Sequence, residues 1–183
     1  MSLSEQLELL KQRGFDDDRA QIIILIREAA IILFRAFSDS FLMYGGANLI
    51  LFHGSLRTSR DLDLLSQGTP LPKADDITRV VSEGLLPLGN LLGVAPLKIT
   101  IEKATSAFIK IEVISKDDRS LFTVDLGGLG SVLGSGVDEH VLEAVSLNAT
   151  ATIKSVSRDH LLLAESRSLC LQAKRQGQRR LRH

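Results

Sequence analysis

The sequence predicts an α+β protein in which a mixed β-sheet is flanked by helices and preceded by an N-terminal helical extension. Two observations predict this class. Two long stretches, residues 16–38 and 74–92, have the apolar content and spacing of helices. Three later runs, 97–102, 108–114 and 121–126, alternate apolar with polar or charged residues, as half-buried strands do.

One domain, residues 1–183, is expected, because this length provides a sizeable core. We divide it into a helical extension at 1–40, a sheet core at 41–157 and a C-terminal helix at 158–183. Lysine plus arginine number 22 and aspartate plus glutamate number 22, so net charge directs the chain toward neither nucleic acid nor membrane. The N-terminus is polar and acidic, unlike a signal peptide, and a cytoplasmic location is expected.

The first long helix is expected to begin at Asp16–Asp18, because aspartates cap and stabilise helix N-termini. It should end at residues 38–40. Its apolar stretch, 22–34, is interrupted by Arg27 and Glu28, and neither piece reaches the roughly 20 residues that a membrane span needs. We therefore expect a buried helix rather than a transmembrane one.

The next segment sets a glycine pair between a strand and a helix. Residues 41–44 are an apolar run typical of a strand, residues 47–52 are compatible with a helix, and Gly45 and Gly46 form the turn between them. Without side chains, this backbone can approach a phosphate closely, and the N–H groups at the helix N-terminus then point at it. We interpret the pair as a candidate phosphate site.

Asp61 and Asp63 form an acid-x-acid pair bracketed by apolar residues. If Leu62, Leu64 and Leu65 mark a strand, its period of two directs both carboxylates to one face. At a separation of roughly 5 Å and an effective dielectric of about 20, their repulsion is about 3 kcal/mol, or roughly two pKa units. A divalent cation would remove this penalty, so the pair is a candidate metal site.

Arg57 and Ser59 precede the acids and suit a phosphate ligand. The planar guanidinium of Arg57 can clamp phosphate oxygens, and the Ser59 hydroxyl can bond a phosphate or orient Asp61. Together with Gly45 and Gly46, these residues favour a functional role for the acids over the alternative of ordinary turn and strand-edge aspartates.

The remaining elements frame this segment. The 74–92 helix should be broken near its end by Pro87 and Gly89. The glycine-rich stretch 127–136 contains no lysine or arginine and is interpreted as a loop over the sheet edge rather than a phosphate loop. The other expected elements are a loop at 68–72, a strand at 151–156 and a helix at 158–175.

A third acid often joins an acid-x-acid pair from a neighbouring strand, and the candidates here are Glu102, Glu112 and Asp125. In residues 108–113 the apolar side chains share one face, which leaves Lys110 and Glu112 on the other. We select Glu112, and the same logic applies to Asp125. A solvated strand face with Lys110 and Glu112 paired across strands remains open as the alternative.

The segments Gly45–Leu49 and Arg57–Asp63 resemble a known signature. An apolar run, a glycine pair, a spacer and Asp-x-Asp are similar to the nucleotidyltransferase signature of the DNA polymerase beta-like superfamily. More narrowly, the two segments resemble the AbiEii/AbiGii toxin family, in which a Gly-Gly-x-x-Leu helix leads to Arg-x-Ser-x-Asp-Leu-Asp. The resemblance is fairly specific and is confined to this part of the chain.

This resemblance implies a nucleotidyltransferase fold and transfer of a nucleotide from a nucleoside triphosphate, with two Mg²⁺ ions. It implies an acceptor such as a tRNA end or a protein hydroxyl, and the toxin of a toxin–antitoxin pair with a cognate antitoxin as partner. No membrane partner is expected. The assigned residues are Asp61, Asp63 and Glu112 for catalysis and metal binding, and Gly45, Gly46, Arg57 and Ser59 for the triphosphate phosphates.

The last helix departs from the family pattern, in which a Glu-Lys pair is followed by an Arg-Asp-x-x-Asp segment. Glu165 is present, but Ser166 stands at the lysine position, with Arg167 adjacent and Lys174 two turns on. No Arg-Asp-x-x-Asp follows. Either the chain is truncated or the active site is incomplete. A catalytically incomplete nucleotide-binding domain and a protein-interaction domain therefore remain alternative functions.

Other reactive residue types favour structural roles. Cys170, the single cysteine, lies in an apolar helical run, as buried thiols do. His53 is placed as a helix-surface or core histidine, and His140 and His160 show no metal-ligand spacing. The C-terminal basic residues fit a solvated helix end, with a salt-dependent RNA contact as the alternative; they are Lys174, Arg175, Arg179, Arg180 and Arg182.

Overall fold

The computed structural model describes residues 1–37, 40–67, 70–128 and 136–161, and it confirms the α+β class. The helices are α1 (Leu3–Gln12), α2 (Asp17–Ala36), α3 (Gly45–Phe52) and α4 (Ala74–Leu91). The strands are β1 (Phe41–Tyr44), β2 (Asp61–Ser66), β3 (Lys98–Ala104), β4 (Phe108–Ile114), β5 (Ser120–Gly128), β6 (Val137–Glu143) and β7 (Thr150–Val156).

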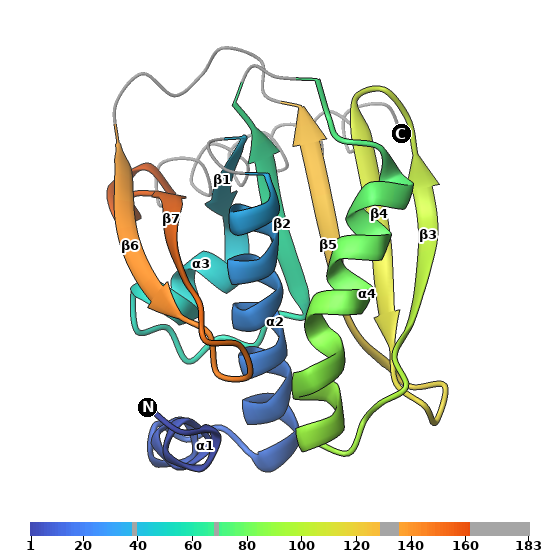
Figure 1. The fold of residues 1–183 in the computed structure, drawn as a ribbon. Helices are drawn as coiled ribbons and strands as arrows, with labels where there is room; N and C mark the ends of the chain where they lie inside the picture. Colours follow the sequence, from blue (N-terminus) through green and yellow to red (C-terminus); the bar gives the residue numbers. More distant parts are fainter. Residues whose placement is uncertain (38–39, 68–69, 129–135, 162–183) are drawn as a thin grey trace, which may run out of the picture.

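The strands form a 7-stranded sheet in the order β3–β4–β5–β2–β1–β7–β6 (Figure 1). The sheet is mixed, as predicted. β2 runs parallel to β5 and β1 runs parallel to β7, whereas β1 and β2 are antiparallel. β3–β4, β4–β5 and β6–β7 are also antiparallel pairs. This order brings β2 and β5, which are far apart in the sequence, side by side at the centre of the sheet.

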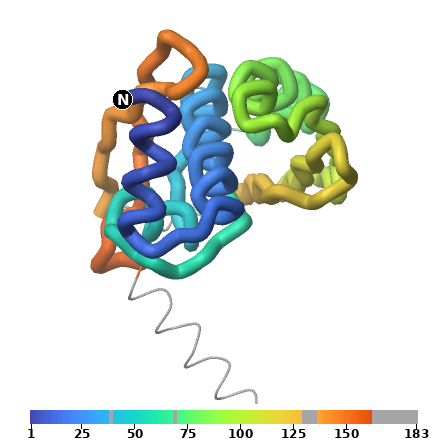
Figure 2. The backbone as a smooth tube through the Cα atoms, turned by 90° about the horizontal axis from the view of Figure 1, so that it is seen from below, coloured from blue at the N-terminus to red at the C-terminus, as the bar shows by residue number. Residues whose placement is uncertain are grey.

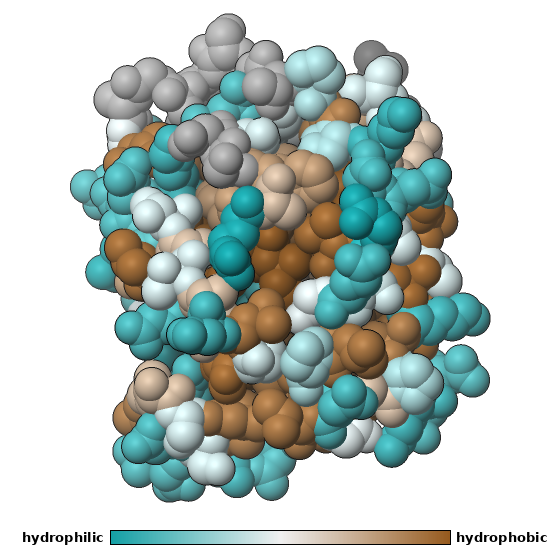
Figure 3. All heavy atoms as spheres, in the orientation of Figure 1, coloured by the Kyte–Doolittle hydropathy of each residue, from teal (hydrophilic) through white to brown (hydrophobic). Residues whose placement is uncertain are grey.

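Helices α2 and α4 cover one face of the sheet and pack against each other. Viewed from below, α2 lies between α1 and α4 (Figure 2). Gly84 of α4 permits this close approach, since a Cβ at that position would lie 2.7 Å from Cδ1 of Ile32 in α2. The space-filling view of the same face shows apolar residues gathered in its middle and hydrophilic residues around them (Figure 3).

The main core lies between these helices and the sheet. Leu62 and Leu64 of β2 and Val124 and Leu126 of β5 are all 0% exposed and belong to it. Alternate residues of each strand supply these contacts, because successive side chains point to opposite faces. The other face carries a smaller apolar cluster, which is formed by Leu42, Val156 and Leu161 with Tyr44, Leu49 and Leu65 packed against it.

Glu28 of α2 is a charged residue that this packing buries completely, at 0% exposure. Its carboxylate accepts hydrogen bonds from the N–H groups of Val145 and Ser146, at 2.9 and 3.0 Å, and from the Ser146 hydroxyl at 2.6 Å. A buried carboxylate is tolerated when donors satisfy its oxygens. Glu28 therefore fixes the β6–β7 connection against α2.

Three expectations differ from the structure. Pro87 lies inside α4, which continues to Leu91, so the predicted break is wrong. Burial of Leu85 and Leu88, both 0% exposed, explains why packing outweighs the hydrogen bond that proline removes. β6 was not predicted, because this edge strand lacks a regular apolar alternation.

Gly127 and Gly128, the first residues of the predicted loop at 127–136, extend β5 instead. Residues 129–135 lie outside the described residues. The predicted last helix, 158–175, falls outside them beyond Leu161. In the part of the chain that the structure describes, no helix is both long and apolar enough to cross a membrane, which agrees with the expectation for α2.

Candidate active site

Strand β2 presents its two aspartates on the sheet face opposite α2 and α4. Leu62 and Leu64 point into the main core, so Asp61 and Asp63, which alternate with them, point to the other face. Asp61 is exposed and Asp63 is half-buried. The shared face that the period of two predicts is therefore present.

A third carboxylate comes from β5. The parallel register pairs Asp63 with Asp125. Glu112, the predicted third acid, lies on the same face of β4 but pairs with Thr123. Thr123 pairs with Asp61 on its other side, and so separates Glu112 from Asp61. The register favours Asp125 over Glu112 as the acid that completes the pair.

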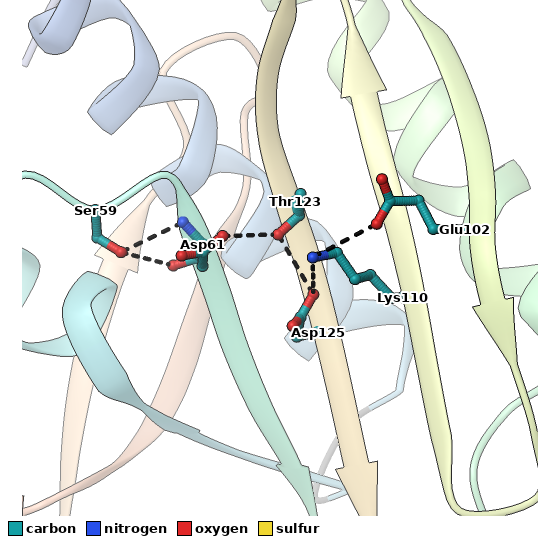
Figure 4. Close-up of polar contacts among 6 residues, drawn as sticks. All are labelled: Ser59, Asp61, Glu102, Lys110, Thr123 and Asp125. Atoms are coloured by element: carbon teal, nitrogen blue, oxygen red, sulfur yellow. Dashed lines mark hydrogen bonds and ion pairs between the residues drawn. The ribbon is translucent and has the colours of Figure 1, made fainter.

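Asp63 and Asp125 form the middle of a polar row that crosses β1, β2, β5 and β4. Tyr44 of β1 pairs with Asp63, and Lys110 of β4 pairs with Asp125. The Lys110 Nζ lies 3.9 Å from Asp125 Oδ1 and 3.5 Å from Glu102 Oε2 (Figure 4). The ion pairs of Lys110 are thus with Asp125 and Glu102, and not with Glu112 as in the alternative that the sequence left open.

Thr123 connects the carboxylates of the two central strands. Its hydroxyl oxygen lies 2.9 Å from Asp61 Oδ1 and 3.3 Å from Asp125 Oδ1 (Figure 4). A hydroxyl has one proton, so it donates to one of these oxygens at a time. Strand alternation placed Thr123 between apolar neighbours, but nothing in the sequence alone indicated that it bridges two aspartates.

Burial and mutual repulsion raise the pKa values on this face. Burial is the main cause that raises the pKa of Asp63 to about 6, with Asp61 and Asp125 adding to it. Burial also raises the pKa of Asp125, against the opposing effect of Lys110. The pKa of Tyr44 is raised to about 12 by burial and by Asp63 and Asp125. Negative charge is therefore incompletely neutralised here, and a bound cation would relieve it.

The glycine pair makes room for two side chains of the site. A Cβ at Gly45 would lie 2.0 Å from Asp63 Oδ2, and Gly45 has a φ of +70°. A Cβ at Gly46 would lie 2.5 Å from the Cβ and Oγ of Ser59. The Gly46 N–H donates to the Asp63 carboxylate. The sequence placed both glycines in a turn before the helix, whereas they are the first two residues of α3. This glycine turn, which was predicted to receive a phosphate, thus seats a protein carboxylate at the N-terminus of α3.

Ser59 and Arg57 lie in the segment between α3 and β2. The Ser59 hydroxyl accepts a hydrogen bond from the Asp61 N–H at 3.3 Å and donates to the Asp61 carbonyl at 3.4 Å. Ser59 therefore fixes the main chain at the start of β2. Arg57 is exposed, and its N–H donates to Ser55 Oγ at 3.1 Å. Their predicted contacts with a triphosphate stay predictions.

Carboxylate oxygens are the ligands that Mg²⁺ prefers, and Asp61, Asp63 and Asp125 supply them from adjacent strands. Among the described residues, no group of three or more His, Cys, Asp or Glu side chains is already placed to hold a metal ion. The residues thus fit Mg²⁺ in donor chemistry, and metal binding would require these side chains to draw together.

The histidines have structural contacts. His140 stacks on Phe52 with ring centroids 3.8 Å apart, and its Nε2 lies 3.2 Å from Ser155 Oγ. His160 Nδ1 lies 3.1 Å from Ser157 Oγ. The predictions made for Glu165, Ser166, Arg167, Cys170 and the basic C-terminal residues fall on positions outside the described residues.

No family model matches the chain, and no curated protein matches it. Among solved structures, a protein named as a nucleotidyltransferase from H. pylori is similar, with a TM-score of 0.55 and 16% identity over 80% of this chain and 57% of that chain. JHP933 from Helicobacter pylori follows, with a TM-score of 0.49 and 15% identity over 74% of this chain and 51% of that chain.

The nucleotidyltransferase toxin MenT4 from Mycobacterium tuberculosis has a TM-score of 0.44 and 13% identity, over 80% of this chain and 52% of that chain. The chain therefore spans little more than half the length of the structures it matches. The first likeness shows that this chain shares its fold with that H. pylori protein, which agrees with the fold that the resemblance implied. Membership of the AbiEii/AbiGii family stays a hypothesis.

Proposed function

We propose that the protein transfers a nucleotide from a nucleoside triphosphate to an acceptor hydroxyl. The observation that carries this proposal is the placement of Asp61, Asp63 and Asp125 on the face opposite the helical layer, on adjacent strands of a nucleotidyltransferase-type fold. The turn at Gly45 and Gly46 borders these acids, because Gly46 donates to Asp63.

In this proposal the three aspartates hold Mg²⁺, with two ions expected. When bound, Mg²⁺ lowers the pKa of the attacking hydroxyl and neutralises the leaving pyrophosphate. The protein contributes a face on which burial, and then repulsion from Asp61 and Asp125, raise the pKa of Asp63. A cation should therefore bind this face more tightly than it binds a single solvated aspartate.

The triphosphate would lie against the glycine turn, with Ser59 and Arg57 near its phosphates. Gly46 donates its N–H to Asp63 in the free protein, so a phosphate at this turn would replace that hydrogen bond. The absence of side chains at Gly45 and Gly46 supports close approach of the phosphate to the backbone.

The acceptor and partners are proposed from the resemblance to the AbiEii/AbiGii family. They are a tRNA end or a protein hydroxyl as acceptor and an antitoxin as partner, with the protein acting in the cytoplasm as the toxin. A test would incubate the protein with Mg²⁺, total tRNA or a protein extract, and each nucleoside triphosphate labelled at the α-phosphate. Label in RNA or in protein identifies the acceptor, and Asp63→Asn should transfer none.

One observation favours a second candidate, a nucleotide-binding domain without transfer activity. The described residues hold no preassembled metal cluster, and Lys110 lies beside Asp125. Binding of a nucleoside triphosphate with Mg²⁺ but no labelled product would select this candidate. Absence of both binding and transfer would select the protein-interaction domain and reject the proposed function.

A further inference from the structure

Lys110 provides a positive charge within the acid-bearing face. Its Nζ lies between two carboxylates, 3.5 Å from Glu102 Oε2 and 3.9 Å from Asp125 Oδ1 (Figure 4). Asp125 borders Asp63 on the neighbouring strand. The Lys110 ammonium therefore lies at one end of the polar row, and Gly46 contacts Asp63 within the same row.

The strand register explains the position of Glu102. β3 and β4 change register between Ile101 and Lys103, and Glu102 is the residue left out of the pairing. A bulge of this kind redirects a side chain. Here the Glu102 carboxylate contacts Lys110, so Lys110 has a second anionic partner besides Asp125.

We propose that Lys110 is a phosphate-binding residue: it neutralises Asp125 in the free protein and contacts the triphosphate once a divalent cation occupies the aspartates. This inference rests on the proposed function, because it takes a metal-bound triphosphate as the ligand. The phosphates would then be contacted from two sides, by the glycine turn on one side and by the Lys110 ammonium on the other.

Electrostatics favours this change of partner. A divalent cation at Asp125 would repel the nearby ammonium and remove the charge that attracted it. The lysine side chain has a flexible four-carbon stem and three donors. Phosphate oxygens brought in with the cation offer those donors a charge-assisted hydrogen bond. The same ammonium therefore opposes binding of the metal alone and favours binding of the metal with a triphosphate.

This opposition defines the experiment. Calorimetric titrations would measure binding of Mg²⁺ alone and of inorganic tripolyphosphate in saturating Mg²⁺ by the wild-type chain, Lys110→Met and Lys98→Met. Lys98 is a matched control, because it is an exposed lysine at the other end of β3, paired with Ile114. Both variants lose one positive charge, so a diffuse charge effect would be the same in each.

Lys110→Met should bind Mg²⁺ at least as tightly as the wild type and bind tripolyphosphate about tenfold more weakly than Lys98→Met. Lys110→Arg should keep most of the affinity for tripolyphosphate. Equal tripolyphosphate affinity in Lys110→Met and Lys98→Met would overturn the proposal. Parallel loss of Mg²⁺ and tripolyphosphate binding would also overturn it, since that pattern means that Lys110 only organises the acids.

Thermal unfolding of each variant would be recorded first. If Lys110→Met does not fold, the double variant Lys110→Gln with Glu102→Gln takes its place, because it removes the ion pair without leaving Glu102 unpaired, and the same two outcomes apply. A wild-type chain that binds neither tripolyphosphate nor any nucleoside triphosphate in Mg²⁺ would reject the proposed function itself. Wild-type binding that Lys110→Met retains in full would reject this inference alone.

Discussion

The two faces of the sheet carry side chains with different roles, although the same strands supply both sets. On the face covered by α2 and α4, Leu62, Leu64 and Val124 are fully buried and hold the fold together. On the other face, Asp63 and Asp125 alternate with those residues and carry charge that burial and mutual repulsion make unfavourable. Residues that stabilise the fold and residues of the candidate site thus alternate along each of these strands.

Substitutions on the two faces should have different effects. Changes on the helix-covered face should lower the free energy of unfolding, with effects on binding that follow from it. Changes on the polar face should alter binding, and can raise stability, because they remove carboxylate charge that burial and mutual repulsion make unfavourable.

The largest stability effect is expected for Leu64→Ala. Leu64 is 0% exposed in the main core, and truncation of a buried leucine leaves a cavity that costs about 3–4 kcal/mol. Urea denaturation monitored by circular dichroism would measure the loss. A loss under about 1 kcal/mol would contradict the assignment of this face as the core that maintains the fold.

Gly46→Ala should destabilise the protein by about 1–3 kcal/mol, because the new Cβ would lie 2.5 Å from the Cβ and Oγ of Ser59. The second-site change Ser59→Gly removes both clashing atoms and should restore most of the lost stability. Thermal melts of the two single variants and the double variant would measure this coupling. Additive losses would show that Gly46 and Ser59 do not meet as described.

Asp63→Asn should raise the free energy of unfolding of the metal-free protein at pH 7.5. The change in the Asp63 pKa from 3.8 to about 6 corresponds to about 3 kcal/mol, which screening at this partly exposed position reduces to about 1–2 kcal/mol. Because the folded-state pKa is the higher one, wild-type stability falls as pH rises from about 4 to about 6, and it stays lower above that range.

The asparagine variant lacks this dependence. Its advantage over the wild type should therefore be full at pH 7.5, smaller at pH 5 and absent near pH 4. Denaturation curves at these three pH values, in the presence of a chelator, would test it. A constant difference across the series would mean that the raised pKa of Asp63 is not its origin.

The sequence predicted the fold class, most element positions and the face shared by Asp61 and Asp63. These features depend on local periodicity, which alternation of leucine and aspartate along β2 makes unambiguous. It failed at Pro87, where burial of Leu85 and Leu88 maintains the helix, and at β6, whose edge position imposes little pattern.

The site was predicted less completely, because its neighbours depend on strand order. The pairing of β2 with β5 and the β4–β5 register place Asp125, Thr123 and Lys110 beside the aspartate pair. Alternation identified Lys110, Glu112 and Asp125 as polar-face residues, but the selection of Glu112 among the acids was made without the strand register that sets their neighbours. The role of the glycine turn in seating Asp63 and Ser59 likewise depends on contacts across the fold.

The most direct test of the central claim compares Asp125→Asn with Glu112→Gln, two charge-matched variants of neighbouring strands on the same face. Titration of each nucleoside triphosphate into both variants and the wild type would be performed in Mg²⁺ and again in chelator. We predict Mg²⁺-dependent binding by the wild type, a loss on the order of a hundredfold in Asp125→Asn, and a change below about threefold in Glu112→Gln. Equal affinity in Asp125→Asn and the wild type, or binding that does not depend on Mg²⁺, would show that Asp125 does not help to hold a metal-bound triphosphate.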